Sequence, residues 1–270
     1  MAGAVRIGIA GWVFAPWRGH FYPEGLVQKK ELAYAAGRLG MIEINATFRA
    51  NQKPASFQRW ASEPPENFVF AVKGPQIVTH IRRLKDVAEP LANFFASGVF
   101  ALGARLGPFV WQLPPNLKFE PERLSAFLEL LPKTTEAAQA LAAQADGARQ
   151  EPFLDTAGVL QIRHALDARH ESFFTAEAEA LLAAHGVALV ISDTLERPHR
   201  TVTAPFVYAR LQGPARPDAA GYEPTDLDAL AGEIAAWRDE DRDVFALFVH
   251  EDKINAPLNA MALMARLGLR

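Results

Sequence analysis

The sequence contains no cysteine. This absence excludes disulfides, thiolate nucleophiles, cysteine-bound iron–sulfur clusters and cysteine-ligated zinc. It also lacks any uninterrupted apolar run of the ~18 to 20 residues that a membrane helix needs. The 28 Lys and Arg residues are balanced by 31 Asp and Glu residues, so the basic excess typical of nucleic-acid-binding proteins is missing. We therefore expect no membrane span, and nucleic acid is disfavoured as a partner.

Several sequence motifs of known chemistry are missing as well. There is no GxGxxG after a strand-like run, no Walker A loop and no GxSxG elbow, which excludes dinucleotide-binding, P-loop and α/β-hydrolase chemistry. No HExxH motif or EF-hand loop is present, so the sequence identifies no metal or other cofactor. A metal site stays open because His, Asp and Glu could converge from several strands. The N-terminus has no signal-peptide pattern, and we expect a cytoplasmic location.

What the 270 residues do contain is a regular alternation of two patterns, with 50% hydrophobic residues to form a core. Eight short apolar runs predict strands at 6–9, 41–45, 69–73, 109–113, 159–169, 187–192, 206–211 and 244–249. Segments of helical periodicity lie between them at 26–39, 54–61, 87–102, 121–131, 176–185, 225–237 and 257–267. Eight strands alternating with helices over this length predict an α/β fold, a (β/α)8 TIM-like barrel.

Two segments depart from the regular alternation. The crossover between the sixth and seventh strands, from Asp193 to Pro205, has scarcely room for a helix. The Ala-rich stretch from Lys133 to Thr156 predicts an extra helical segment after the fourth strand. Because no Pro-, Gly- or Ser-rich linker divides the chain, we expect a single domain over residues 1–270.

The predicted strands share one feature: each begins apolar or small and ends polar. Alternate residues share a face of a strand, and the carboxyl ends of barrel strands face the pocket. The predicted ring of polar ends comprises Glu43, Asn45, Lys73, Gln112, Asp167, Arg169, Asp193, Arg210, Gln212 and His250. A strand must also become polar where it meets solvent, so one such residue alone would indicate nothing. Seven strands with the same polarity favour a true pocket.

The charges in this ring suggest its ligand. The cations Lys73, Arg169 and Arg210 could bind phosphate or carboxylate, Arg through its planar fork. Asp167 and Arg169 lie on one face of a strand, so they could equally form a structural ion pair. The expected ligand is a small polar molecule, anionic or polyhydroxylated, and Asn45, Gln112, Asp167, Asp193 and Gln212 would help to bind and orient it.

Proton transfer needs a group whose pKa lies near the working pH. Glu43 is the first candidate because burial on a barrel strand raises the pKa of a carboxyl group. His80 and His250 are the other candidates, although a lone histidine is more often a hydrogen-bonded structural residue. Trp12 belongs to an aromatic loop after the first strand that could stack on a ligand. The loop could also be a small satellite core, which the aromatic content favours slightly.

The chain resembles the DUF72 (YecE-like) family at several separated motifs in the family order. They include Gly11-Trp12, Phe21-Tyr22-Pro23, the second-strand run 42–48, Gln112-Leu113-Pro114-Pro115 and the run 164–173. The resemblance spans nearly the whole chain and implies a TIM-like barrel. It implies a set of pocket residues but no reaction, since function does not follow from fold.

The sequence departs from the family pattern at four sites. Asp167 replaces a Glu, Arg49 replaces a Tyr, Gln212 stands in an RLHG-like segment at the His position, and Phe248-Val249-His250-Glu251-Asp252 replaces an FNND-like segment. Gln212 cannot transfer a proton as His would, which weakens any mechanism that depends on that position.

We predict an enzyme that performs acid–base chemistry, such as hydrolysis, elimination or isomerisation, with Glu43 as proton-transfer group and His80 or His250 as its counterpart. The alternative is a non-catalytic barrel that binds a metabolite or a partner. A third interpretation, binding of single-stranded nucleic acid through Trp12 and Trp17, is disfavoured by the charge balance. The sequence does not predict the oligomeric state.

Overall fold

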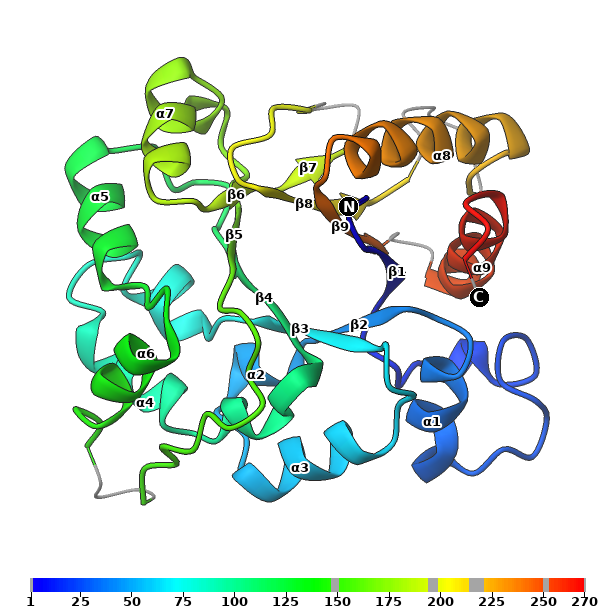
Figure 1. The fold of residues 1–270 in the computed structure, drawn as a ribbon, viewed down its shortest axis with the longest axis horizontal. Helices are drawn as coiled ribbons and strands as arrows, with labels where there is room; N and C mark the ends of the chain where they lie inside the picture. Colours follow the sequence, from blue (N-terminus) through cyan, green and yellow to red (C-terminus); the bar gives the residue numbers. More distant parts are fainter. Residues whose placement is uncertain (1, 147–150, 194–198, 214–220, 250–252, 270) are drawn as a thin grey trace. The chain divides into compact units, whose positions relative to one another are not determined.

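The structure is a computed structural model, and it describes residues 2–146, 151–193, 199–213, 221–249 and 253–269 (Figure 1). The described chain forms two compact units. Unit 1 comprises Met1–Glu43, Pro64–Phe68 and Val190–Arg270, and unit 2 comprises Ile44–Glu63 and Val69–Leu189. Each unit combines parallel strands with helices, and each is described separately below.

In unit 1 the strands lie in the order β2-β1-β9-β8-β7. The strands and helices of this unit, with their bounds, are β1 (Val5–Ala10), α1 (Glu31–Ala36), β2 (Met41–Ile44, of which Ile44 belongs to unit 2), β7 (Ile191–Ser192), β8 (Phe206–Leu211), α8 (Pro224–Asp239), β9 (Asp243–Phe248) and α9 (Ala256–Arg266). Short 3₁₀ turns occupy Ala15–Trp17, Gln28–Lys30 and Lys253–Asn255. All residues of β8 are buried, as expected for a parallel strand covered on both faces.

In unit 2 the strand order is β6-β5-β4-β3. Its strands and helices are α2 (Ala46–Arg49), α3 (Pro54–Ser62), β3 (Val69–Lys73), the π-helix η3 (Ile77–Ile81), α4 (Ala88–Phe95), η4 (Val99–Arg105), β4 (Leu106–Gln112), α5 (Pro121–Leu130), α6 (Thr135–Ala142), β5 (His164–Asp167), η5 (Glu171–Phe173), α7 (Ala176–Ala184) and β6 (Ala188–Leu189). Proline opens α3 and α5, where its missing N–H costs nothing. Thr134 and Thr175 cap α6 and α7.

The core of unit 2 is aromatic. Phe95 stacks on Phe100 with ring centroids 5.7 Å apart, and Phe109 meets Phe95 edge-to-face at 5.2 Å. Trp111 on β4 packs edge-to-face against Phe94 and Phe127. Such pairs add to the stabilisation from burying large rings. They fix β4, and with it the strand ends of the unit.

Most predicted elements are confirmed, including the extra helix α6 after the fourth strand. The irregular crossover is confirmed in its described part, because residues 199–205 contain no helix. Residues 194–198 lie outside the described residues.

Three predicted boundaries are wrong. The sixth predicted strand is two short strands, because β6 pairs with β5 whereas β7 pairs with β8. The fifth begins only at His164, since the preceding segment is not buried and Leu160 is 78% exposed. The predicted helix 87–102 breaks at Gly98, which adopts a φ of 105° that ends the helix.

Candidate functional site

The best-defined polar contact in unit 1 joins Glu43 on β2 to Arg210 on β8. Nη1 of Arg210 lies 2.6 Å from Oε1 and 2.5 Å from Oε2 of the carboxylate. The hydroxyl of Tyr208 donates to Oε2 at 2.8 Å. Glu43 is fully buried and Arg210 is 5% exposed. The predicted alternation along this strand is confirmed for Tyr208 and Arg210, because both reach the same carboxylate.

This pair has the composition of a structural ion pair. Buried charges cost free energy unless they are paired and hydrogen-bonded, and here both oxygens accept donors. A carboxylate engaged in this way has little capacity left to accept a substrate proton. The predicted proton-transfer role of Glu43 therefore stays a prediction. The geometry favours a structural role for Glu43, as the buried partner of Arg210.

A second cluster of unit 1 forms around Asp193, which directly follows β7. The backbone N–H of Gln212 donates to Oδ1 at 2.7 Å, and the hydroxyl of Tyr222 donates to Oδ2. The amide of Gln212 donates to Oγ of Ser192 at 3.1 Å. Burial raises the pKa of Asp193, although these donors and Arg200 partly offset the effect. These contacts brace the chain just beyond β8.

Trp12 is half-buried, and its carbonyl oxygen accepts a hydrogen bond from the Tyr22 hydroxyl at 2.5 Å. In the same loop Trp17 packs edge-to-face against Phe21 and Tyr22, and all three rings are buried. These rings form a satellite core, the interpretation that the sequence slightly favoured. A ligand contact for Trp12 stays a prediction, and His250 lies outside the described residues.

In unit 2, Lys73, Phe48 and His80 lie together. Lys73 ends β3, and its ammonium lies 4.3 Å from the ring centroid of Phe48. The imidazole of His80 meets the same ring edge-to-face at 5.0 Å. Both Lys73 and His80 are half-buried. The cation and the imidazole are thus held against one aromatic side chain and remain partly open to solvent.

Arg169 extends this cluster. Burial lowers the pKa of His80 first, and the positive charges of Lys73 and Arg169 lower it further. Both positive charges therefore act on the imidazole, and all three residues belong to unit 2. Arg169 also pairs with Asp167 at 3.4 Å; the guanidinium side chain is 27% exposed and the carboxylate side chain 5%. We call Lys73, His80 and Arg169 the cationic cluster.

The remaining predicted residues of unit 2 lie at the ends of strands. Gln112 is the register partner of Asp167, and both stand at the carboxyl ends of adjacent parallel strands. Asn45 follows β2 and precedes α2, and it is half-buried. No contact that we describe ties either side chain to the cationic cluster, so their orienting roles stay predictions.

Sequence reasoning missed several hydroxyl groups around these sites. Thr47 is buried, and its hydroxyl lies 2.6 Å from the carbonyl oxygen of Lys73, fixing the end of β3. Thr79 contacts Nδ1 of His80 at 2.9 Å. Tyr208 and Tyr222 bind the carboxylates of Glu43 and Asp193. Thr79 adjoins His80 in the sequence and could have been noted there. The partners of Thr47, Tyr208 and Tyr222 lie 26, 165 and 29 residues away, so no local signal identified them.

His164, the first residue of β5, is a structural residue. Nδ1 accepts a hydrogen bond from the Trp111 indole at 3.2 Å, and Nε2 lies 2.7 Å from the carbonyl oxygen of Pro132. Burial lowers its pKa to about 4, so the ring is neutral at pH 7. Within the described residues no group of three or more His, Asp or Glu side chains could hold a metal ion.

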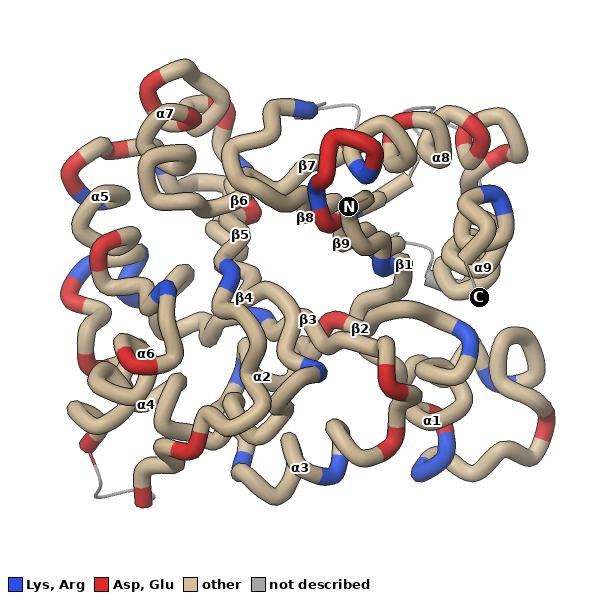
Figure 2. The backbone as a smooth tube through the Cα atoms, viewed as in Figure 1, with Lys and Arg blue, Asp and Glu red and all other residues tan. Residues whose placement is uncertain are grey.

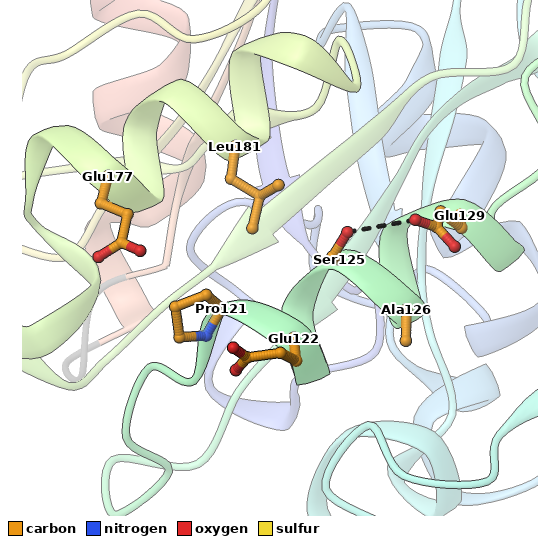
Figure 3. Close-up of a pocket in the computed structure, with 7 residues that line it drawn as sticks. All are labelled: Pro121, Glu122, Ser125, Ala126, Glu129, Glu177 and Leu181. Atoms are coloured by element: carbon orange, nitrogen blue, oxygen red, sulfur yellow. Dashed lines mark hydrogen bonds between the residues drawn. The ribbon is translucent and has the colours of Figure 1, made fainter.

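A groove of about 610 Å³ lies between α5 and α7 in unit 2 (Figure 3). Three carboxylates line it, from Glu122, Glu129 and Glu177, and Figure 2 shows acidic positions along both helices. Glu122 and Glu177 lie in the first turns of their helices, where negative charge complements the helix dipole. No predicted site residue lines this groove, and its charge opposes an anionic ligand.

The comparisons with known proteins bear on the whole chain. Residues 6–270 match the family described as "Protein of unknown function DUF72". The chain belongs to the DUF72 family. A DUF72 family protein of Thermotoga maritima shares the fold with a TM-score of 0.74 and 24% identity over 98% of this chain and 99% of that one. One of Enterococcus faecalis gives a TM-score of 0.70 at 16% identity, covering 99% of both chains.

Among curated relatives, UPF0759 protein YecE of Escherichia coli is 28% identical over 131 residues, and UPF0759 protein YunF of Bacillus subtilis is 27% identical over 116 residues. The matched regions cover 44% and 40% of those proteins, and 47% and 41% of this chain. The DUF72 chain thus spans less than half of the length of the curated relatives it matches.

These likenesses confirm the predicted family and the predicted fold class, an α/β fold of the TIM-like type. In this DUF72 chain Gln212, at the position where the family resemblance implied His, serves as a hydrogen-bond donor to Ser192 and, through its backbone, to Asp193. No helix in the described part of the chain has the length and apolar character that crossing a membrane requires.

Proposed function

We propose that this DUF72 protein is an enzyme that performs acid–base chemistry on a small anionic or polyhydroxylated molecule at the cationic cluster. Lys73 and Arg169 bind negative charge on the ligand, and His80 is the hydrogen-bonding acid that faces it. The observation that carries the proposal is that Lys73 and His80, both half-buried, are held against the ring of Phe48 within unit 2. The charge of Arg169 acts on the same imidazole. Arrangements of this kind, with a perturbed pKa and convergent polar groups, are frequent at functional sites.

The chemistry follows from the charges. Because burial and both cations lower the pKa of His80 below its ordinary 6.5, the imidazole is largely neutral at pH 7. The N–H of a neutral imidazole can stabilise an oxygen on which negative charge develops, while Lys73 and Arg169 hold the anionic part of the ligand. Hydrolysis of esters and amides, and elimination or isomerisation next to a carbonyl group, develop negative charge on such an oxygen. The roles predicted for Trp12, Glu43, Asn45, Gln112, Asp193, Arg210, Gln212 and His250 stay predictions.

Inorganic phosphate at constant ionic strength is the first test. A ligand that binds only the folded state raises the free energy of unfolding, by about 2.7 kcal/mol at a hundredfold excess over Kd, and so raises the Tm. We expect phosphate to raise the Tm of the wild type and to lose most of this effect in Lys73→Gln and Arg169→Gln. Lys133→Gln removes an exposed charge of the same unit and serves as the matched control. An equal phosphate effect in all four proteins would contradict the proposal.

A non-catalytic binding protein is the second candidate, and one observation favours it. The carboxylate first predicted to transfer protons, Glu43, is buried and hydrogen-bonded to Arg210 and Tyr208. Turnover separates the two candidates. If the protein is an enzyme, an anionic metabolite that raises the Tm is converted by the wild type and bound without conversion by His80→Asn. A binding protein leaves it unchanged in both cases.

A further inference from the structure

The hydroxyl of Thr79 is the only group that contacts Nδ1 of His80 among the described residues. Thr79 lies in the π-helix η3, is fully buried, and places Oγ1 2.9 Å from Nδ1. Within the described chain Oγ1 makes no other hydrogen bond. Local π-helices are frequently found at functional sites.

The direction of the hydrogen bond between Thr79 and His80 follows from the need of the buried hydroxyl for an acceptor. A buried hydroxyl whose proton finds no acceptor loses about 1–3 kcal/mol. The acceptor within reach of the Thr79 hydroxyl is Nδ1, so the hydroxyl donates and Nδ1 keeps its lone pair. In a neutral imidazole the ring proton then resides on Nε2.

Nε2 of His80 is available for a further hydrogen bond. It makes no hydrogen bond to a described residue, and it is not among the side-chain atoms that are sealed from solvent without a partner. The edge-to-face contact with Phe48 fixes the plane of the ring. His80 therefore presents a single N–H group on the ring that packs against Phe48, the side chain that Lys73 also contacts.

The backbone that carries His80 is held in an uncommon conformation. The N–H of Arg82 reaches back to the carbonyl of Ile77, and that of Leu84 to Val78. Arg83, Leu84 and Asp86 then adopt left-handed φ values of 51°, 67° and 51°. Non-glycine residues in this region cost roughly 1–3 kcal/mol each and cluster at ligand clamps. These hydrogen bonds and φ values hold the backbone around His80 in a single conformation.

We propose that Thr79 is a positioning residue that locks His80 in the tautomer with the proton on Nε2, so that the cationic cluster offers its ligand donors only. The ammonium of Lys73, the guanidinium of Arg169 and the Nε2–H of His80 then match an acceptor without a proton of its own. The ligand class is an oxyanion, such as a carboxylate, a phosphate or an enolate oxygen. The ligand class rests on the proposed function, whereas the tautomer does not.

Nitrogen NMR of the protein labelled with ¹⁵N-histidine tests this inference without any activity. We expect the wild type at pH 7.5 to show a protonated Nε2 and an unprotonated Nδ1 for His80, assigned by its loss in His80→Asn. Thr79→Val keeps the shape of the side chain and removes the hydroxyl, so we expect a mixture of tautomers. Thr79→Ser restores the hydroxyl and should restore the wild-type signals. A wild type protonated on Nδ1, or a Thr79→Val spectrum identical to wild type, would overturn the inference.

Phosphate affinity, measured in parallel, separates this inference from the proposed function. We expect Thr79→Val to bind inorganic phosphate several-fold more weakly than wild type and Thr79→Ser to bind it about as well. If His80 of the wild type is protonated on Nε2 but phosphate does not bind, the proposed function and the ligand class are overturned. The role of Thr79 in fixing the tautomer would still stand. If phosphate binds but the proton of His80 lies on Nδ1, only the inference about the tautomer is overturned. If Thr79→Val does not fold, the wild-type tautomer and Thr79→Ser decide the question.

Discussion

Charged side chains stand in two different environments in this protein. In unit 1, Glu43 and Arg210 form a buried pair, whereas the cationic cluster of unit 2 is partly open to solvent. The carboxylate of Glu43 is fully buried and accepts hydrogen bonds from Arg210 and Tyr208. Lys73, His80 and Arg169 are half-buried, and two like charges act on one imidazole. A saturated buried pair holds a fold together, whereas we propose that the half-exposed cations bind a ligand. The difference indicates that burial and partners, rather than residue type, separate cohesion from function here.

The largest expected effect breaks the buried pair. Glu43→Gln removes the buried carboxylate charge that accepts hydrogen bonds from the Arg210 guanidinium and the Tyr208 hydroxyl, and removing one partner of a buried ion pair costs about 3–5 kcal/mol. We expect denaturant unfolding to show a loss of this size. The double variant Glu43→Met/Arg210→Met should recover most of it, because an apolar pair of similar volume needs no counter-charge. If Glu43→Gln were as stable as wild type, the ion pair would not contribute to the stability of the fold.

The next effect concerns the buried histidine of unit 2, His164. His164 is buried with a pKa lowered to about 4, so the unfolded chain takes up a proton near pH 6.5 while the folded protein does not. The stability that neutral His164 contributes is complete above pH 6.5 and is lost as pH falls to about 4, by roughly 3 kcal/mol. Unfolding free energies across this range should therefore fall more steeply in wild type than in His164→Gln. Parallel curves would contradict this account of His164.

A smaller effect is expected at the cationic cluster itself. Arg169→Gln removes a pair with Asp167 at 3.4 Å whose cation is partly exposed, and such pairs contribute about 0–1 kcal/mol. The variant should therefore unfold within about 1 kcal/mol of wild type while it loses phosphate binding. A loss of unfolding free energy as large as that of Glu43→Gln would show that Arg169 stabilises the fold. Its charge would then have the same structural role as that of Arg210.

The smallest effect tests the strained segment behind His80. Asp86 is exposed with a φ of 51°, so Asp86→Gly should relieve strain and stabilise the protein by a few tenths of a kcal/mol to about 1 kcal/mol. Lys85→Gly, at an exposed neighbour without a left-handed φ, should destabilise it by increasing the entropy of the unfolded chain. The same sign for both variants would show that the segment is not strained at Asp86.

The sequence predicted the strands well because parallel strands are buried on both faces and read as apolar runs. It also predicted the shared face of Tyr208 and Arg210, which follows from the alternation of side chains. Gly98 carried the signal that ends a helix, and the predicted helix nevertheless ran through it. The sixth strand could not be divided from sequence, because its exchange of partners depends on the neighbouring strands β5 and β8.

The candidate site was predictable in residue type and less so in role. Lys73, His80 and Arg169 were predicted from their places in the sequence, but burial distinguishes them from Glu43, and burial depends on the tertiary structure. The partners of Thr47 and Tyr208 lie 26 and 165 residues away along the chain. No local pattern specifies hydrogen bonds over such separations, so the groups that orient the site emerged only from the folded chain.

The central claim is that an oxyanion binds between Lys73, His80 and Arg169. A pH titration of the His80 ring by NMR, with and without saturating inorganic phosphate, tests it most directly. Bound negative charge favours the protonated imidazole, so we predict that phosphate raises the pKa of His80 from its lowered value and that Lys73→Gln diminishes the rise. A His80 pKa that phosphate leaves unchanged, at concentrations that shift other signals of the protein, would contradict the claim.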